Sequence, residues 1–449
     1  MSDKLRAHYD ERLPRYTSYP TAPLFSPAIA APSYAQWLAA LPASTKTSLY
    51  LHVPFCRSMC WYCGCHTTIT RRDEPIGDYI GVLRREIELV AEKVPVSLPV
   101  HHVHFGGGTP TIVEPEVLLS LAALLRDRFA FAAEAEVAVE IDPRTLTPQM
   151  TVALGEAGIT RASLGVQSFD PRVQKAINRI QSVATTATAV EGLRAAGVRG
   201  INFDLIYGLP LQTVASCIDT VRQCLDLRPD RFSVFGYAHV PDFKKHQRKI
   251  NEADLPASDA RHDQAEAIAE ALVDAGYVRI GFDHFARADD AMARAQAEGR
   301  LRRNFQGYTT DPCDALIGFG ASAIGRLPQG YVQNDVVLGR YADHVMRGEF
   351  ATAKGYRLTD DDRLRAELIE RLMCDLAVDV AAVSARHDAA PDNLAPALAR
   401  LRTLADDGIV RLDGPRVVVA DHARLLVRTV ASAFDAYLTQ SDRTFSRAV

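Results

Sequence analysis

Strand-like and helix-like segments alternate from about residue 47 to residue 290, and this alternation limits the possible folds more than any other feature. The strand-like runs are SLYLHVPF, VHHVHFGGG, EVAVEID, ASLGVQS, INFDLIYGLP, RFSVFGYAHV and YVRIGFDHF. Helical patterns lie between them at Tyr79–Lys93, Pro115–Phe129 and Ala260–Ala275, the last with Ser258 as N-cap and Gly276 as C′ residue. Such alternation predicts an α/β fold with a parallel sheet, open or closed into a TIM-like barrel. Functional residues are therefore expected at the carboxyl ends of the strands.

Two flanking regions lack this alternation. Residues 1–46 are rich in Pro, Tyr and Ala, and we expect them to form an N-terminal arm on a barrel domain of residues 47–335. Residues 336–449 are predicted to form a mainly helical, winged-helix-like C-terminal domain. Its expected elements are helices at Asp361–Val378, Leu394–Asp407 and His422–Leu438, and a hairpin in RLDGPRVVV.

The composition is that of an ordinary soluble protein, with a formal net charge of -4 over 449 residues. Acidic and basic residues are interspersed, so neither nucleic acid nor an anionic membrane is expected as a main partner. The N-terminus is charged and lacks an apolar core, and no apolar run approaches the length of about eighteen residues that a membrane span needs. We therefore expect a cytoplasmic protein.

Four of the eight cysteines lie together in HVPFCRSMCWYCGC, directly after the first predicted strand. In a reducing compartment such a cluster favours metal binding over disulfides. Structural zinc sites use two separated cysteine pairs and ferredoxins use other spacings, so three thiols here are predicted to hold a four-iron cluster with one open iron. The predicted ligands are Cys56, Cys60 and Cys63. A zinc knuckle or incidental thiols are the alternatives, and Cys65 is expected to be a passive neighbour. The scattered Cys217, Cys224, Cys313 and Cys374 are expected to be buried apolar side chains.

Polar residues follow several of the predicted strands. Gly106–Gly108 would let the backbone approach a ligand closely, although a tight turn explains the glycines equally well. Glu140 lies late in the strand EVAVEID and Asp204 lies in an otherwise apolar strand, so each must meet a cation, a hydrogen-bond donor or a ligand. Gln167 and Arg179 bracket the exit of the fourth strand and could hold ligand hydroxyls and a carboxylate. His52 shares one strand face with Tyr50, either as a core residue or in contact with substrate or cluster.

The Cys-x3-Cys-x2-Cys spacing after a first barrel strand resembles the radical S-adenosylmethionine (SAM) superfamily. The resemblance implies a [4Fe-4S] cluster whose open iron binds the amino and carboxylate groups of SAM. It implies that an electron from the cluster breaks the sulfonium bond, giving methionine and a 5′-deoxyadenosyl radical. The glycine run then resembles the segment that holds the methionine amino group.

Nearly the whole chain resembles one family, the oxygen-independent coproporphyrinogen III oxidases (dehydrogenases) of bacterial haem synthesis. The matching strings include PRYTSYPT, VEIDPR, LGVQSFD, FDLIYGLP, FGYAHVP, GFGASAIG and FSRAV, together with DHFAR and RNFQGYTT, which are specific to this family. The resemblance implies two SAM molecules beside one cluster. The first would contact Tyr50, Gly107, Glu140 and Ile324; the second would contact Tyr62, Gly108, Thr109, Gln167, Arg179, Asp204 and Ala238. Tyr50 and His52 are the expected catalytic residues.

The implied reaction is oxidative decarboxylation of two propionate side chains of coproporphyrinogen III to vinyl groups, giving protoporphyrinogen IX. Because this substrate carries four carboxylates, Arg15, Arg287 and Arg303 are candidate clamps. The segment HVPDFKKHQRKI departs from the family pattern, since Lys244 and Lys245 make it more basic than expected. A reductant such as flavodoxin or ferredoxin is the expected partner, and a monomer is expected.

Proteins with two other functions also resemble this chain in part. A haem-binding chaperone of the same broader family would bind haem without oxidising coproporphyrinogen. Such chaperones typically lack the counterpart of Cys65, the PRYTSYP arm and the RNFQGYT segment, and all three are present here. The second alternative is another radical enzyme acting on a tetrapyrrole, such as a methyltransferase-like haem-degrading paralogue.

Overall fold

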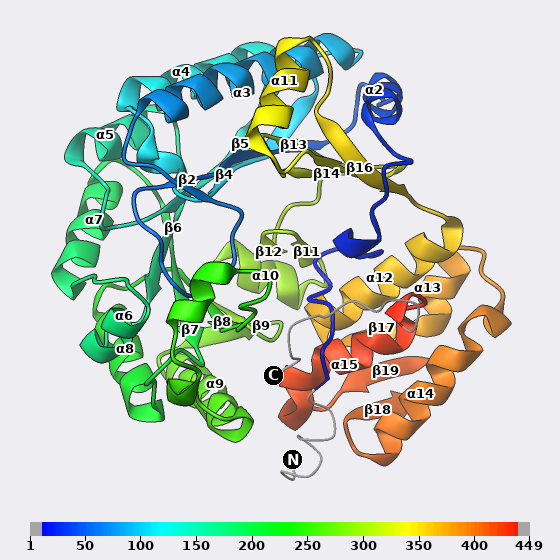
Figure 1. The fold of residues 1–449 in the computed structure, drawn as a ribbon. Coiled ribbons are helices and arrows are strands. Elements are labelled where there is room, and N and C mark those ends of the chain that lie inside the picture. The colour runs from blue at the N-terminus through cyan, green and yellow to red at the C-terminus, as the bar shows by residue number, and fades with distance from the viewer. Residues whose placement is uncertain (1–10, 439–449) are drawn as a thin grey trace.

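The main element of the structure is an open sheet of twelve strands, in the order β16-β15-β14-β13-β1-β4-β5-β6-β7-β8-β10-β9 (Figure 1). The structure is a computed structural model and describes residues 11–438. β16 and β9 form the two edges, so the sheet curves as an open barrel. This confirms the predicted α/β fold with an open TIM-like barrel. The string FSRAV and the first ten residues of the arm lie outside the described residues.

Six of the predicted runs form strands that are parallel to one another, as the alternation predicts, and a seventh parallel strand at Ala315–Phe319 lies outside the predicted runs. Leu49 and Leu51 of the first strand are fully buried, and Leu49 lies opposite Val103 and Ile317 of its two neighbours. Because the strands are parallel, their carboxyl ends meet at one edge of the barrel. They are β13 (Ala315–Phe319), β1 (Thr47–Val53), β4 (Pro99–Gly107), β5 (Ala130–Ile141), β6 (Arg161–Gln167), β7 (Gly200–Tyr207) and β8 (Arg231–Gly236).

Helices cover the outer face of these strands and form an arc around them (Figure 1). In α3, buried Ile80, Leu83, Ile87 and Val90 recur every three or four residues, so one face of the helix packs on the sheet. The crossover helices are α3 (Glu74–Lys93), α4 (Pro115–Arg128), α5 (Pro148–Glu156), α6 (Pro171–Ala176), α7 (Val183–Ala195), α8 (Val214–Asp226) and α9 (Ser258–Asp274).

Two helix starts differ from the prediction. α3 begins at Glu74, five residues earlier than predicted, with a proline in its first turn where no backbone N–H is needed. Ser258 is the first residue of α9 and its N-cap is Ala257, so the predicted N-cap is wrong by one residue. Gly276, just after α9, has a φ of 89°, which suits a glycine C′ residue.

Antiparallel strands extend the sheet on both sides. The run YVRIGFDHF, predicted as one strand, forms two strands that turn back at Gly281. Gly281 has a φ of 53°, a left-handed conformation that interrupts a strand. The added strands are β9 (Tyr277–Ile280), β10 (His284–Arg287), β14 (Ile324–Leu327), β15 (Gly330–Asn334) and β16 (Thr352–Arg357). Shorter elements are α2 (Ala31–Ala39), α10 (Ala291–Ala297), α11 (Leu338–Met346), β11 (Arg302–Asn304) and β12 (Gly307–Thr309).

The C-terminal region is mainly helical, with a small three-stranded sheet beside the helices. The predicted hairpin is present as β18 and β19, but the predicted last helix is broken into two 3-10 turns around a short α-helix. The domain boundary near residue 335 stays a prediction, and β16 of the large sheet lies beyond it. The elements are α12 (Asp360–Asp375), β17 (Ala377–Asp379), α13 (Val380–Arg386), α14 (Ala395–Asp406), β18 (Val410–Asp413), β19 (Arg416–Val419) and α15 (Val427–Ala431).

The N-terminal arm joins the C-terminal region to the large sheet. The Tyr16 hydroxyl donates to the Asp435 carboxylate at 3.0 Å, and the Tyr19 hydroxyl accepts from Ala436 N–H at 2.9 Å. Ser26 then exchanges two backbone hydrogen bonds with Gly355 in β16. The arm is thus ordered by contacts with both parts of the chain. Within residues 11–438, no helix combines the length and the apolar character that crossing a bilayer requires.

A buried carboxylate on α3 binds the loop after β13 by hydrogen bonds. The Glu86 side chain accepts hydrogen bonds from Gly320 N–H and Asn334 Nδ2, both at 2.6 Å, and from the Tyr341 hydroxyl at 2.7 Å. Burial raises the pKa of Glu86 from 4.5 to about 7, and these three donors limit the rise. The protonated form is therefore favoured by folding.

Because the pKa of Glu86 is higher in the folded chain than in the unfolded chain, its stabilising contribution is complete below pH 4.5 and is lost as pH rises towards 7. In the wild type, this loss should lower the free energy of unfolding by up to about 3 kcal/mol as pH rises. Glu86→Gln should not show it. Urea midpoints measured between pH 4.5 and 8 test this. Glu92→Gln, exposed on the same helix, is the control and should keep the wild-type slope. An unchanged slope in Glu86→Gln would contradict the assignment.

The turn between β9 and β10 has no room for a side chain. A Cβ at Gly281 would lie 2.0 Å from the Tyr308 ring, whereas a Cβ at Gly299 would meet nothing within 4 Å, and both glycines have positive φ. Gly299→Ala should therefore cost only backbone strain, roughly 1 kcal/mol of the free energy of unfolding. Gly281→Ala should cost at least about 2 kcal/mol more, because Tyr308 must also move. Thermal unfolding of the two variants measures the difference, and equal losses would show that Tyr308 adapts freely.

Candidate active site at the carboxyl edge of the barrel

The cysteine loop begins where β1 ends and lies against the turn after β4. β2 (Phe55–Cys56) opens the loop and pairs with β3 (Thr68–Ile69), which closes it. Gly108 N–H donates to Val53 O at 2.9 Å, and Thr109 N–H donates to Phe55 O at 2.8 Å. These bonds hold the predicted cysteine loop and the predicted glycine turn side by side.

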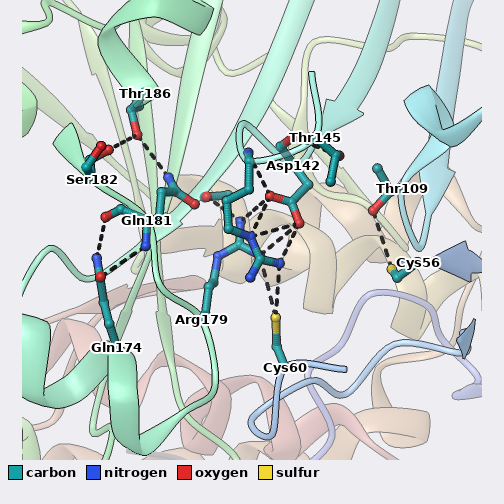
Figure 2. A network of polar contacts seen from close by, with 12 residues as sticks. Cys56, Cys60, Thr109, Asp142, Thr145, Gln174, Arg179, Gln181, Ser182 and Thr186 are labelled. Carbon is teal, nitrogen blue, oxygen red and sulfur yellow. Dashed lines mark hydrogen bonds and ion pairs between the residues drawn. The ribbon is translucent and has the colours of Figure 1, made fainter. Parts of the chain in front are cut away.

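The loop thiols lie among hydrogen-bond donors and cations, although burial raises the pKa of Cys56. The Cys56 thiol is 3.4 Å from the Thr109 hydroxyl, and the Cys60 sulfur accepts from Arg144 Nη2 at 3.5 Å and Arg179 Nη1 at 3.6 Å (Figure 2). A hydrogen bond from Cys65 lowers the pKa of Cys63 to about 7 against the opposing effect of burial. Thiolates are the form that ligates iron, so this environment fits the chemistry of a cluster. The described residues contain no group of three His, Cys, Asp or Glu side chains already arranged around one metal position.

Asp142 joins two arginines beside Cys60, a feature that the sequence analysis missed. Its carboxylate pairs with Arg144 at 2.6 Å and with Arg179 at 3.3 Å (Figure 2). Burial raises the pKa of Asp142, but the two guanidinium groups hold it below its usual value. Asp142 and Arg144 follow β5 directly, so the signal was a charged pair at a strand end in VEIDPR.

The glycine turn is closed to side chains. A Cβ at Gly108 would lie 2.5 Å from Phe55 O, and one at Gly107, whose φ is 121°, would lie 2.9 Å from the His52 ring. Gly107 N–H donates to Glu140 at 3.0 Å, and His104 Nε2 lies 3.2 Å from the other Glu140 oxygen. Burial raises the pKa of Glu140, but these bonds bring it below its usual value. The predicted site residues Gly107 and Glu140 are therefore in contact.

Tyr50 and His52 form a hydrogen-bonded pair on β1. His52 Nε2 lies 3.1 Å from His66 O, and because a carbonyl only accepts, Nε2 carries the proton. Nδ1 then accepts from the Tyr50 hydroxyl at 2.9 Å. Burial lowers the pKa of His52, which favours this neutral ring. The Tyr79 hydroxyl donates to His52 O at 2.6 Å and fixes the strand end from outside the sheet.

Asp204 faces the interior of the barrel. It accepts from the Ser163 hydroxyl at 3.0 Å and from Asn202 Nδ2 at 2.9 Å. Burial, followed by the charge of Glu140, raises its pKa to about 6. Asp204 and Glu140 line one cavity of about 180 Å³ between the strands. The sequence did not decide whether Asp204 meets protein groups or a ligand. In the structure it has polar partners and also faces a space for a ligand.

The remaining predicted residues lie around this edge without forming one cluster. Gln167 ends β6 in a left-handed conformation with a φ of 66°. Gln247 donates to both Tyr62 O and Ala238 O, at 3.0 and 3.2 Å, so it joins these two residues through the backbone. Ile324 begins β14, and its carbonyl lies beside Gly318, which is opposite Tyr50 in the sheet.

A second, larger cavity is rich in arginine. It has a volume of about 660 Å³, and two of the three candidate clamps, Arg303 and Arg15, line it; their role as clamps stays a prediction. Nε and Nη1 of Arg303 are buried and have no hydrogen-bond partner among the described residues, and the guanidinium lies 4.5 Å from the centre of the Tyr308 ring. Arg287 does not belong to this cavity; it is exposed and pairs with Asp289 at 3.1 Å. The arginines of the lining are Arg12, Arg15, Arg261, Arg303 and Arg428.

The scattered cysteines are separate from this site. Cys217, Cys224 and Cys374 are buried, as expected, whereas Cys313 is half-buried.

Comparisons with known proteins agree with this geometry. Residues 50–224 match the Radical SAM superfamily, and residues 358–426 match the HemN C-terminal domain. The chain is 62% identical to the oxygen-independent coproporphyrinogen III oxidase of Bradyrhizobium diazoefficiens over the full length of both chains. It is 40% identical to the Escherichia coli protein of that name, covering 98% of this chain and 97% of that one.

A solved structure supports the same relationship. The chain superimposes with a TM-score of 0.90 and 38% identity on the Escherichia coli coproporphyrinogen III oxidase (HemN), which is described as a radical SAM enzyme, over 95% of this chain and 100% of that one. The chain therefore belongs to the oxygen-independent coproporphyrinogen III oxidase family of the radical SAM superfamily.

Proposed function

We propose that this chain converts coproporphyrinogen III to protoporphyrinogen IX by oxidative decarboxylation of two propionate side chains. Cys56, Cys60 and Cys63 would hold a [4Fe-4S] cluster beside two SAM molecules. The supporting observation is the meeting of a thiol loop, a glycine turn and an arginine-lined cavity at one edge of the barrel. The names of the curated relatives support the same substrate.

When bound, the cluster supplies the electron that cleaves the sulfonium bond of SAM. Arg144 and Arg179 donate hydrogen bonds to the Cys60 sulfur and would hold it in place as a ligand. Glu140, ionised and fixed by Gly107 N–H, offers an acceptor for the amino or ribose hydroxyl groups of the first SAM. Tyr50 and Ile324 complete that site. Gly108 provides backbone without a side chain for the second SAM, with the remaining contacts from Tyr62, Thr109, Gln167, Arg179, Asp204 and Ala238.

The arginine-lined cavity would hold the substrate carboxylates. Guanidinium groups bind carboxylates in a fixed planar geometry, which can orient one propionate towards the site while the other carboxylates stay paired. His52 is neutral and accepts a hydrogen bond from Tyr50. It would therefore neither give a proton to that propionate nor take one from it. Closure of the cavity would exclude water and oxygen from the reacting carbon.

We also propose that the protein works in the cytoplasm as a monomer and receives electrons from a carrier such as flavodoxin or ferredoxin. The compartment is inferred from the cysteine usage, since a reducing environment keeps such a thiol cluster free for metal.

The deciding experiment is anaerobic reconstitution with iron and sulfide, then incubation with SAM, a reductant and coproporphyrinogen III. We expect protoporphyrinogen IX together with 5′-deoxyadenosine and methionine. Tight haem binding without turnover would instead identify a haem chaperone.

The ligand assignment is tested by Cys60→Ala. We expect loss of the brown iron–sulfur chromophore and of 5′-deoxyadenosine release, because one of three thiolates is missing. Cys374→Ala is the matched control, a buried cysteine far along the chain, and should keep both. Iron analysis and absorption spectra of the reconstituted proteins measure the effect; wild-type iron content in Cys60→Ala would contradict the assignment.

The arginine-lined cavity is tested by Arg303→Ala. Loss of one buried charge-assisted hydrogen bond should lower kcat/KM for coproporphyrinogen III by roughly 10- to 100-fold, or about 1.5–3 kcal/mol. Substrate-independent SAM cleavage should change little, because the side-chain contacts of Arg303 among the described residues are with Arg15, Phe282 and Tyr308. Arg287→Ala removes an exposed arginine and should behave as wild type. Equal losses in both variants would exclude the cavity as the substrate site.

A further inference from the structure

A short basic segment lies directly on the cysteine loop. It spans residues 241–250 and contains a 3-10 turn at Lys245–Lys249. Lys244 Nζ donates to Cys65 O at 2.9 Å, and His246 Nε2 donates to Cys63 O at 2.7 Å. The segment therefore covers the part of the loop that would surround the cluster.

The charge of this segment is unbalanced. It holds four cations, Lys244, Lys245, Arg248 and Lys249, against one acid, Asp242. Arg248 lies 3.7 Å from Asp242, and no ion pair between described residues includes any of the three lysines. The whole chain has a net charge of -4, so the excess of positive charge here is local. An acidic partner would be repelled by the chain as a whole and attracted to this segment, which orients its approach.

The segment also carries an apolar contact point. The Phe243 side chain is 71% exposed, and no other large apolar side chain among the described residues is as exposed. An exposed aromatic residue among cations matches the composition of transient protein interfaces, in which an apolar centre has a polar rim. Gly64, Cys65 and His66 of the cysteine loop are exposed beside it, so the loop itself reaches the surface here.

We propose that residues 241–250, with Phe243 at the centre, are the docking surface for an acidic one-electron carrier protein. This inference rests on the proposed function, because only a cluster on the underlying loop needs an external electron. The reduced carrier loses one electron and the cluster gains it, with no bond made or broken and no proton transferred. Small size, weak affinity and electrostatic steering are typical of such complexes.

The test is the rate of cluster reduction in the reconstituted, full-length protein. A reduced acidic flavodoxin serves as the carrier, and a small uncharged photoreductant serves as the reference. The variant is Lys245→Glu with Arg248→Glu, two exposed positions outside the proposed ligand contacts. The control is Lys93→Glu with Arg199→Glu, which changes net charge equally at exposed positions before β4 and β7, at the opposite end of the barrel.

At low ionic strength, we expect the double reversal to lower the second-order rate with flavodoxin at least about tenfold. The rates of variant and wild type should converge within about twofold at 0.5 M salt, where surface charges are screened. Reduction by the small photoreductant should be unchanged in every variant, and the control pair should match wild type with both reductants. Phe243→Ser should slow reduction by flavodoxin without altering its salt dependence.

Three results would overturn the proposal: wild-type rates with flavodoxin in the double reversal, an equal loss with both reductants, or an equal loss in the control pair. Failure of flavodoxin to reduce the intact wild-type cluster would also overturn it. These outcomes are distinct from failure of the proposed function, which would appear earlier as a wild-type protein that assembles no reducible cluster or forms no protoporphyrinogen.

Discussion

The close approach of the Gly106–Gly108 backbone to the ends of β1 and β2 is the constraint on which the rest of the site depends. Two backbone hydrogen bonds join the turn to Val53 and Phe55, and a Cβ at Gly108 would overlap the Phe55 carbonyl. Only glycine allows this distance. The cysteine loop starts at this contact, so the position of the thiols relative to the glycine N–H groups follows from it.

Charge is arranged differently on the two sides of this contact. Near the thiols, Asp142 pairs with both Arg144 and Arg179, and Gln174 and Gln181 order the segment that carries Arg179 (Figure 2). In the larger cavity, arginines outnumber acids, and part of the Arg303 guanidinium is unpaired among the described residues. The Arg303 guanidinium also lies over the rings of Phe282 and Tyr308, so the cavity is a positively charged space that suits an anionic ligand.

The larger cavity depends on all three regions of the chain. Arg15 comes from the arm, Arg261 and Arg303 from the barrel region, and Arg428 from the C-terminal helices. Arg428 also donates to the carbonyls of Leu13 and Pro14, which ties the arm to the last helix. The arm and the C-terminal region therefore act as walls of the cavity, and the barrel alone would leave it open to water.

The sequence by itself determined the parallel sheet and the edge at which the site lies, and it predicts the cysteine ligands, because periodicity and thiol spacing are local properties of the chain. It also contained the strings by which the chain resembles its family. The tertiary structure alone decided which charges pair, since Asp142 follows β5 and Arg179 lies between α6 and α7, 37 residues further along the chain. It likewise decided that Gly281 divides one apparent strand, that the last predicted helix breaks, and that Arg287 lies outside the cavity while Arg428 lies within it. Local patterns cannot supply these facts, because each depends on which distant groups compete for the same space and the same hydrogen bonds.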